Sequence, residues 1–130
     1  MPIQHLDHVN VVTAKLEEMV AWYEAIIGLQ SGPRPDFPFG GAWLYAGDAA
    51  VVHLVENTNE TRIGSEAALK LEHFAFSATG ASAFERKLEE CGDPFKKIEV
   101  RDAGLIQFHV SDPDGNHVHI DFSIEEEKER

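Results

Sequence analysis

The stretch DPDGNHVHIDF, residues 112–122, predicts a tight turn followed by a β-strand. Its first five residues favour turns, because Asp and Asn side chains bond to nearby backbone and Gly accepts a positive φ. The six residues after them alternate between an apolar and a polar set: Val118, Ile120 and Phe122 against His117, His119 and Asp121. Since successive side chains of a strand point to opposite faces, one face is predicted to pack on a core while the other carries imidazoles and a carboxylate.

Outward from this strand, the chain predicts one order of elements twice: a strand, a helix and further strands. Module one, about residues 3–56, has a strand at 3–12, a helix at 15–27 ended by Gly28, and strands within 29–34, at 42–46 and at 49–55. Module two, about residues 70–123, has a strand at 71–77, a helix to Cys91 ended by Gly92, and strands at 97–101, 105–110 and 117–122. The polar segment 57–69 predicts a linker, and residues 124–130 predict a solvated acidic tail.

The helix of module two is predicted to begin with a capping box, because Ser82 is followed three residues later by Glu85. The helices of the two modules end at matching places. Gly28 lies 20 positions after His8, and Gly92 lies 19 positions after His73.

Four histidines occupy corresponding places in the modules: His8 and His53 in the first, His73 and His119 in the second. The members of the two pairs are 45 and 46 positions apart. Apolar neighbours point to the opposite face of each strand, so all four imidazoles are predicted to face away from the helices. A lone strand histidine is more often a surface residue than a ligand. Four at repeat-related positions predict one metal site, because imidazole is the commonest ligand of catalytic transition metals.

The remaining three histidines serve as comparisons. His5 lies off the face of His8 and is predicted to be exposed, and His109 is predicted to have a structural role. His117 and Asp121 share the face of His119 at two-residue spacing, so they are candidates for contacts that orient a ligand imidazole. A pair of ordinary surface side chains explains these two residues about as well.

Composition bounds the class of protein. The chain has 130 residues, 43% of them hydrophobic, which fits one compact domain. Its formal net charge of −12 argues against nucleic acid as a partner, since phosphate binding needs a basic surface. The sequence lacks a membrane-length apolar run and a signal-peptide pattern, and its one cysteine, Cys91, gives no sign of an oxidising compartment. We therefore expect a cytoplasmic protein.

Several motifs resemble those of the vicinal oxygen chelate superfamily, which includes glyoxalase I, bleomycin-binding proteins and extradiol dioxygenases. They are Leu6-Asp7-His8-Val9, Trp22-Tyr23-Glu24 before Ile27-Gly28-Leu29, Glu72-His73-Phe74-Ala75-Phe76 and the turn at residues 112–116. The resemblance implies a single α+β domain over residues 1–130: two βαβββ modules forming cupped, mostly antiparallel sheets with helices on the outer faces. It also implies a homodimer that acts on a small-molecule substrate. It does not identify the reaction, because one scaffold hosts many chemistries.

In that superfamily the metal ligands come from the first and last strands of each module, which implies His8, His53, His73 and His119 here. The last ligand is usually glutamate, and this chain has His119 in its place. Four neutral imidazoles leave a divalent ion at its full charge, which favours anionic oxygens and lowers the pKa of bound water. Nitrogen ligands disfavour Mg²⁺ and suit Zn²⁺, Ni²⁺, Co²⁺, Fe²⁺ or Cu²⁺. Alternatively, His119 does not ligate, and three histidines leave open positions.

Other residues are candidates for proton transfer and substrate binding. Asp121 is the best candidate for the base that the missing glutamate would supply. The candidates for the substrate pocket are Arg34, Phe37, Trp43, Tyr45 and Gln107. Trp43 and Tyr45 are explained as well by core packing. Arg34 can clamp an anionic group, and a solvated arginine is an equal alternative.

Three functions remain open. The leading hypothesis is a metal-dependent enzyme that chelates two neighbouring oxygens of a small metabolite and performs isomerase, epimerase or lyase chemistry. With Fe²⁺, extradiol-type oxygen-dependent ring cleavage becomes the alternative. A metal-free protein of the bleomycin-binding type is favoured by the acidic charge and the aromatic loop, and the four histidines argue against it. The sequence leaves open whether the site lies within one chain or is shared across a dimer.

Overall fold

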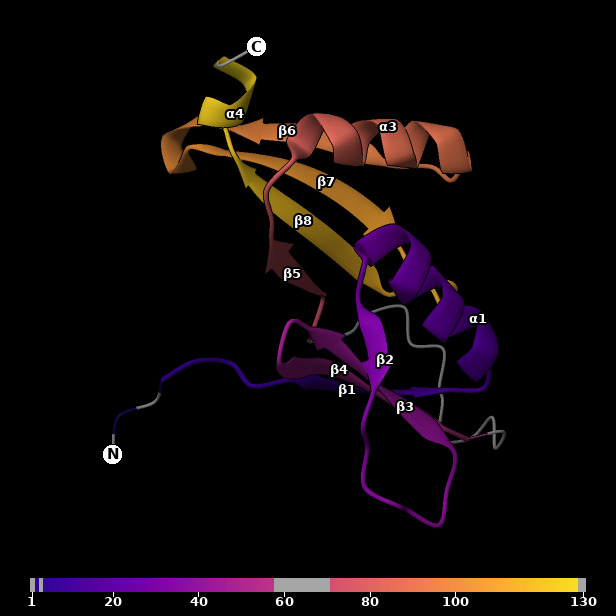
Figure 1. Ribbon diagram of the computed structural model, residues 1–130. Helices are drawn as coiled ribbons and strands as arrows, with labels where there is room; N and C mark the ends of the chain where they lie inside the picture. The colour runs from indigo at the N-terminus through magenta and orange to yellow at the C-terminus, as the bar shows by residue number, and fades with distance from the viewer. Residues whose placement is uncertain (1, 3, 58–70, 129–130) are drawn as a thin grey trace. The chain divides into compact units, whose positions relative to one another are not determined.

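The computed structural model describes residues 2, 4–57 and 71–128 of the chain. The chain divides into two compact units, residues 1–66 and 67–130 (Figure 1). Each unit holds one four-stranded mixed sheet, in which one strand pair is parallel and two are antiparallel. This arrangement is consistent with the predicted α+β fold of two modules. The predicted linker, apart from Asn57, lies outside the described residues.

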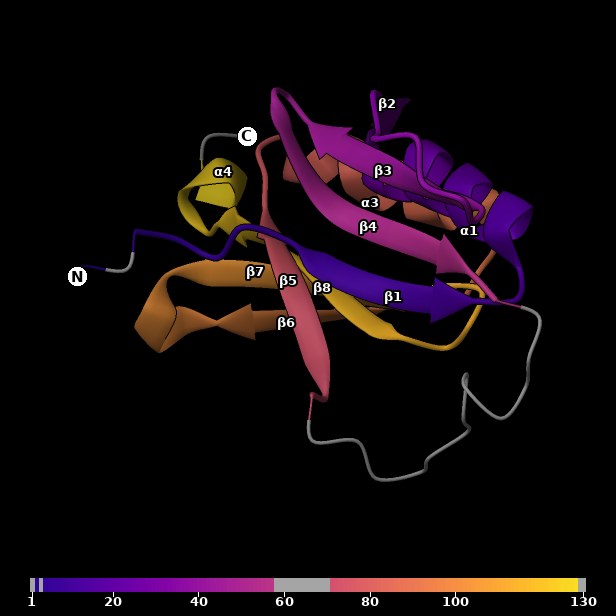
Figure 2. The same cartoon turned by 90° about the horizontal axis from the view of Figure 1, so that it is seen from below.

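The first unit contains four strands and one helical segment. Its elements are β1 (Val9–Thr13), α1 (Leu16–Trp22), η1 (Tyr23–Ile27), β2 (Gln30–Gly32), β3 (Gly41–Ala46) and β4 (Ala49–Glu56). The sheet order is β1-β4-β3-β2, and Figure 2 shows β4 between β1 and β3. The first strand begins at Val9 rather than at the predicted residue 3, so His8 lies just before it.

The helical segment of the first unit ends in a wider turn than an α-helix. Residues Tyr23–Ile27 form a π-helix that continues α1, and Gly28 ends it in the left-handed conformation at φ +89°. The buried side chains of this segment are Met19, Tyr23 and Ile26. The segment contacts β3 and β4, whose Leu44, Val52 and Leu54 complete the core. The predicted helix at 15–27 is thus present, with a local change of helix type.

The second unit repeats the order. Its elements are β5 (His73–Ser77), α3 (Ala81–Cys91), β6 (Lys96–Val100), η2 (Arg101–Ala103), β7 (Leu105–Ser111), β8 (His117–Ser123) and α4 (Glu125–Lys128). The sheet order is β5-β8-β7-β6. Residues Ile106, Phe108, Val118, Ile120 and Phe122 are buried on one face, and the Phe84 ring of α3 lies 5.6 Å and 5.5 Å from the rings of Phe108 and Phe122. The predicted alternation of residues 117–122 is confirmed.

The predicted turn at residues 112–116 is also confirmed. Asp112 is buried, and its carboxylate accepts bonds from the backbone N–H of Asp114 at 3.0 Å and of Asn116 at 2.9 Å. The side-chain amide of Asn116 donates a third bond to it at 2.8 Å. A buried carboxylate is tolerated here because these donors replace water.

The predicted capping box is wrong. Helix α3 begins at Ala81, so Ser82 lies inside the first turn and cannot cap it, and Gly80 takes the N-cap position at φ +91°. Instead, Glu126 of α4 accepts bonds from the backbone N–H of Gly80 at 3.0 Å and of Ala81 at 2.8 Å. The C-terminal segment is therefore not merely solvated, because it satisfies donors that the start of a helix leaves open.

No helix among the described residues combines the length and the apolar character needed to cross a membrane.

Candidate metal centre

The two predicted ligands of the first unit lie ring against ring. His53 lies in the middle of β4, and the rings of His8 and His53 stack with centroids 3.8 Å apart. The Trp43 ring stacks on His53 at 4.0 Å, because antiparallel pairing places Trp43 opposite His53. His53 is thus held between two flat side chains.

One ring nitrogen of each of these two histidines already has a hydrogen-bond partner. His8 Nδ1 lies 2.7 Å from the Asp7 carboxylate, and His53 Nε2 lies 3.1 Å from the carbonyl oxygen of Ala50. Burial, with a smaller contribution from His8, lowers the pKa of His53 below its ordinary value. A neutral imidazole at pH 7 is the form that binds a metal.

The second unit gathers four histidines on the face of its sheet opposite the core. They are His73 on β5, His109 on β7, and His117 and His119 on β8. The ring of His119 lies 4.6 Å from the ring of His73 and 4.6 Å from the ring of His109. The ring of His117 lies 5.1 Å from His73 and 5.0 Å from His109. Strand register produces this cluster, since His117 is paired with His73 and His119 with His109.

Two carboxylates bond to imidazoles of this cluster. Asp121 lies two residues after His119 on the same face, and its carboxylate is 2.5 Å from His119 Nδ1. Glu72, just before β5, bonds to both His73 Nδ1, at 3.2 Å, and His117 Nδ1. These two bonds lower the pKa of the Glu72 carboxyl below its ordinary value, with His117 as the larger cause. The second unit therefore brings negative charge to its imidazoles.

His109 is a member of the cluster that the sequence interpretation treated as structural. Its Nδ1 lies 2.7 Å from His117 Nε2, and its Nε2 lies 2.9 Å from Gln107 Oε1. Burial, followed by the neighbouring His119, lowers the pKa of His109. The two-residue spacing of Gln107 and His109 hinted at this placement, but only the β7–β8 register shows which histidine lies opposite.

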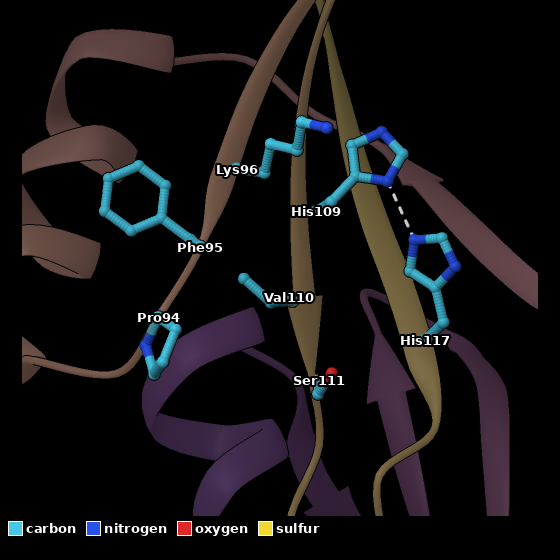
Figure 3. Close-up of a pocket in the computed structure, with 7 residues that line it drawn as sticks. All are labelled: Pro94, Phe95, Lys96, His109, Val110, Ser111 and His117. Carbon is cyan, nitrogen blue, oxygen red and sulfur yellow. Dashed lines mark hydrogen bonds between the residues drawn. The ribbon is translucent and has the colours of Figure 1, made fainter.

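A cavity of about 300 Å³ opens beside His109 and His117. Its lining is shown in Figure 3: Pro94, Phe95, Lys96, Val110 and Ser111 with the two histidines. The close-up also shows the two imidazoles meeting edge to edge through their hydrogen bond. Gln107, a predicted pocket residue, contacts the cluster through His109.

The remaining predicted pocket residues gather in the first unit. Phe37 and Phe39 stack at 5.0 Å in the loop between β2 and β3, and Phe37 lies 6.5 Å from Trp43. The Arg34 guanidinium lies over both phenylalanine rings, at 5.1 Å and 5.5 Å, and donates to the Phe39 carbonyl at 2.8 Å. The Tyr45 hydroxyl donates to the Pro33 carbonyl at 2.5 Å. Arg34 and Tyr45 therefore brace this loop, and both phenylalanine rings stay partly exposed.

The chemistry of the donors fits a transition metal. Three predicted ligands have Nδ1 against a carboxylate, namely His8 with Asp7, His73 with Glu72 and His119 with Asp121. Such contacts orient metal-binding imidazoles and direct the opposite nitrogen, Nε2, to the ion. Within the second unit, ligand atoms of Glu72, His73 and His117 all lie within 4.8 Å of one another. Because the two predicted histidine pairs lie in different units, a single four-histidine site stays a prediction.

Comparison with known proteins decides the family. Residues 5–120 match the family described as the Glyoxalase/Bleomycin resistance protein/Dioxygenase superfamily. The chain belongs to this superfamily. The predicted resemblance to the vicinal oxygen chelate proteins is confirmed, and with it a fold that binds small molecules and offers possible metal ligands.

Individual members of the glyoxalase superfamily are similar over most of the chain. Glyoxylase I 4 of Arabidopsis thaliana is 29% identical over 120 residues, which span 88% of this chain and 68% of that protein. A putative glyoxalase family protein from Bacillus anthracis is 28% identical with a TM-score of 0.75, covering 95% of this chain and 98% of that one. Lactoylglutathione lyase from Agrobacterium tumefaciens, 18% identical, has a TM-score of 0.68 and covers 93% and 95% of the two chains. The last similarity shows the fold alone.

Proposed function

We propose that this protein is a metal-dependent enzyme of the glyoxalase superfamily that acts on two neighbouring oxygens of a small metabolite. The observation that carries the proposal is the meeting of repeat-related imidazoles within each unit, at 3.8 Å for His8 and His53 and 4.6 Å for His73 and His119. Carboxylates beside Nδ1 of three of these imidazoles support metal binding, because such contacts commonly orient metal-binding histidines.

The residues that would hold the metal are His8, His53, His73 and His119. A divalent Zn²⁺, Ni²⁺, Co²⁺ or Fe²⁺ ion bound by them would supply positive charge to stabilise an enolate-like substrate during isomerase, epimerase or lyase chemistry. Asp7, Glu72 and Asp121 fix the orientation of three of these imidazoles. Of the three carboxylates, Asp121 has the least exposed side chain, 17%, beside the buried His119.

Asp121 is also our candidate for proton transfer. Its Oδ1 faces His119 Nδ1, so the pair can hold one proton between two atoms that lie 2.5 Å apart. A carboxylate that is mostly shielded from water keeps such a proton localised. The substrate would be bound by Trp43, Gln107 and the aromatic loop with Phe37, while Arg34 and Tyr45 hold that loop in shape.

The test is exchange of substrate hydrogen with solvent. In D₂O, untagged protein loaded with Zn²⁺, Ni²⁺, Co²⁺ or Fe²⁺ should incorporate deuterium next to the carbonyl of a reactive member of a panel of small α-hydroxyketones and 2-hydroxyacyl thioesters, observed by NMR. A chelator should stop the exchange, and Asp121→Asn should slow it by about 100-fold or more. Exchange that survives metal removal, or its absence with every metal and compound, would refute the proposal.

One observation favours a second candidate, a ligand-binding protein that carries out no reaction. Phe37 and Phe39 are 38% and 45% exposed and stack beside the Arg34 cation, which suits a flat, anionic aromatic ligand. Tight binding of such a ligand to the metal-free protein, without turnover, would support this candidate over the enzyme. We also propose that the protein is cytoplasmic and that it forms a homodimer. Light scattering of the purified protein would test the homodimer.

A further inference from the structure

Glu72 joins two histidines of the second unit that the predicted ligand set does not join. Its Oε1 lies 3.2 Å from His73 Nδ1, and its Oε2 meets His117 Nδ1. The two imidazoles come from adjacent parallel strands, β5 and β8, where His73 is paired with His117. Glu72 lies just before β5, and its side chain is long enough for the carboxylate to contact both rings.

The other ring nitrogen of His117, Nε2, contacts His109. Gln107 Oε1 accepts from His109 Nε2–H at 2.9 Å, which leaves Nδ1 of a neutral His109 as an acceptor. With that tautomer of His109, His117 Nε2, 2.7 Å from that nitrogen, is the donor. A neutral His117 then presents the lone pair of Nδ1 to the Glu72 carboxylate, which is also an acceptor. A proton or a metal ion between these two atoms would satisfy both, and the ligand atoms of Glu72, His73 and His117 are close enough to share one ion.

We propose that Glu72, His73 and His117 form a cation site of the second unit that binds a divalent transition-metal ion without His8 or His53, as an alternative to the four-histidine set for the same metal-dependent function. Two imidazoles and one carboxylate suit Zn²⁺, Co²⁺ or Fe²⁺, and three protein ligands leave positions open for water or substrate. The ligand atoms lie within 4.8 Å of one another, whereas ligands of one tetrahedral ion lie about 3.3 Å apart, a spacing that follows from metal–nitrogen distances near 2.0 Å. To bind one ion, the three side chains must rotate toward one another, and their exposures of 65% for Glu72, 42% for His73 and 33% for His117 leave room for this.

The triad differs from the predicted four-histidine set in a way that can be measured. The two sets share His73, so replacing that residue cannot separate them. Only the triad uses Glu72 and His117 as ligands, and only the four-histidine set uses His8 and His53. The carboxylate of Glu72 would also offset part of the charge of the ion, as the glutamate missing at position 119 does in the pattern of the superfamily.

The experiment is competition titration of Zn²⁺ between the full-length, untagged chain and a chromophoric chelator, with Co²⁺ absorption as a second readout. The double variant His8→Ala/His53→Ala should keep Zn²⁺ binding, with an affinity within about threefold of the parent. Adding Glu72→Gln, which removes the charge but keeps the shape, should lower the affinity at least about tenfold and change the Co²⁺ spectrum. His117→Ala in the same background should do likewise.

In the His8→Ala/His53→Ala background, Asp7→Asn is the matched control, since Asp7 precedes position 8 as Glu72 precedes His73. It should leave the affinity of the second-unit site unchanged. Loss of binding in His8→Ala/His53→Ala with a folded circular dichroism spectrum would overturn the triad and favour the four-histidine set. Equal affinity with and without Glu72→Gln would also overturn it. Failure of the whole protein to bind Zn²⁺ or Co²⁺ would show that the cation between Glu72 and His117 is a proton only.

Discussion

In the first unit His53 lies between two stacked rings, whereas in the second unit the corresponding His119 lies among imidazoles and bonds to a carboxylate. The strand register makes the correspondence direct. Trp43 is paired with His53, and His109 is paired with His119. One pairing position therefore holds a stacking ring in one unit and a hydrogen-bonding ring in the other.

The residue before the first histidine differs by one methylene between the units. Asp7 bonds to its neighbour His8 at 2.7 Å, while the longer Glu72 bonds to His73 and also reaches His117 on the next strand. The first unit thus offers a flat aromatic surface, and the second offers a network of hydrogen bonds between imidazoles and carboxylates.

The largest expected effect breaks the network of the second unit. In metal-free protein, His119→Ala should lower the free energy of unfolding by about 2 kcal/mol, because it leaves the mostly buried Asp121 without its partner. His53→Ala should cost about 1 kcal/mol, since it removes mainly ring stacking. Urea denaturation measures both. Equal costs in the two variants would contradict the distinction between the units.

Trp43→Leu should sharpen the same contrast on the first unit. It keeps an apolar side chain but removes the stack on His53, so we expect a loss of about 1 kcal/mol in the free energy of unfolding. Trp43→Phe is the control that retains a ring and should lose less. If leucine and phenylalanine behave alike, ring stacking contributes nothing to holding His53.

The pH dependence of stability should involve one histidine in each unit. Burial lowers the pKa of His53 and His109 in the folded protein, so as the pH falls the unfolded chain binds more protons than the folded protein. This contribution to stability is therefore complete above about pH 6.5, the ordinary histidine value, and is lost below it. Chemical denaturation of metal-free protein should show stability rising with pH across that range. His109→Gln should reduce the slope, and an unchanged slope would contradict the assignment.

The smallest expected effect comes from exchanging the acidic residues at positions 7 and 72. Glu72→Asp should lose the contact with His117 while keeping the one with His73, and it should weaken Zn²⁺ binding by about threefold to tenfold. Asp7→Glu should leave Zn²⁺ binding by Glu72, His73 and His117 unchanged, because the position in the first unit that corresponds to His117 is Val51, which cannot ligate. Competition titration of both variants gives the answer. A stronger effect for Asp7→Glu would reverse the comparison.

Local patterns in the sequence predicted the elements and the faces, and contacts distant in sequence decided the rest. The alternation from His117 to Phe122 predicts which side chains face the core, and the turn before it needs only its own residues. The cap that Glu126 provides for α3 joins residues 45 and 46 positions apart, so no local pattern announces it. His109 joins the cluster only through the β7–β8 register, and the reach of Glu72 depends on which strand lies beside β5.

The central claim is that oriented imidazoles hold a transition metal, and the most direct test is the metal content of the untagged protein. After purification without an affinity tag and exposure to Zn²⁺, elemental analysis should find about one ion per chain, and His73→Ala should abolish it, because His73 belongs to both proposed ligand sets. A folded wild-type protein that takes up neither Zn²⁺, Ni²⁺, Co²⁺ nor Fe²⁺ would contradict the account. Full stoichiometric binding in His73→Ala would contradict the assignment of the ligands.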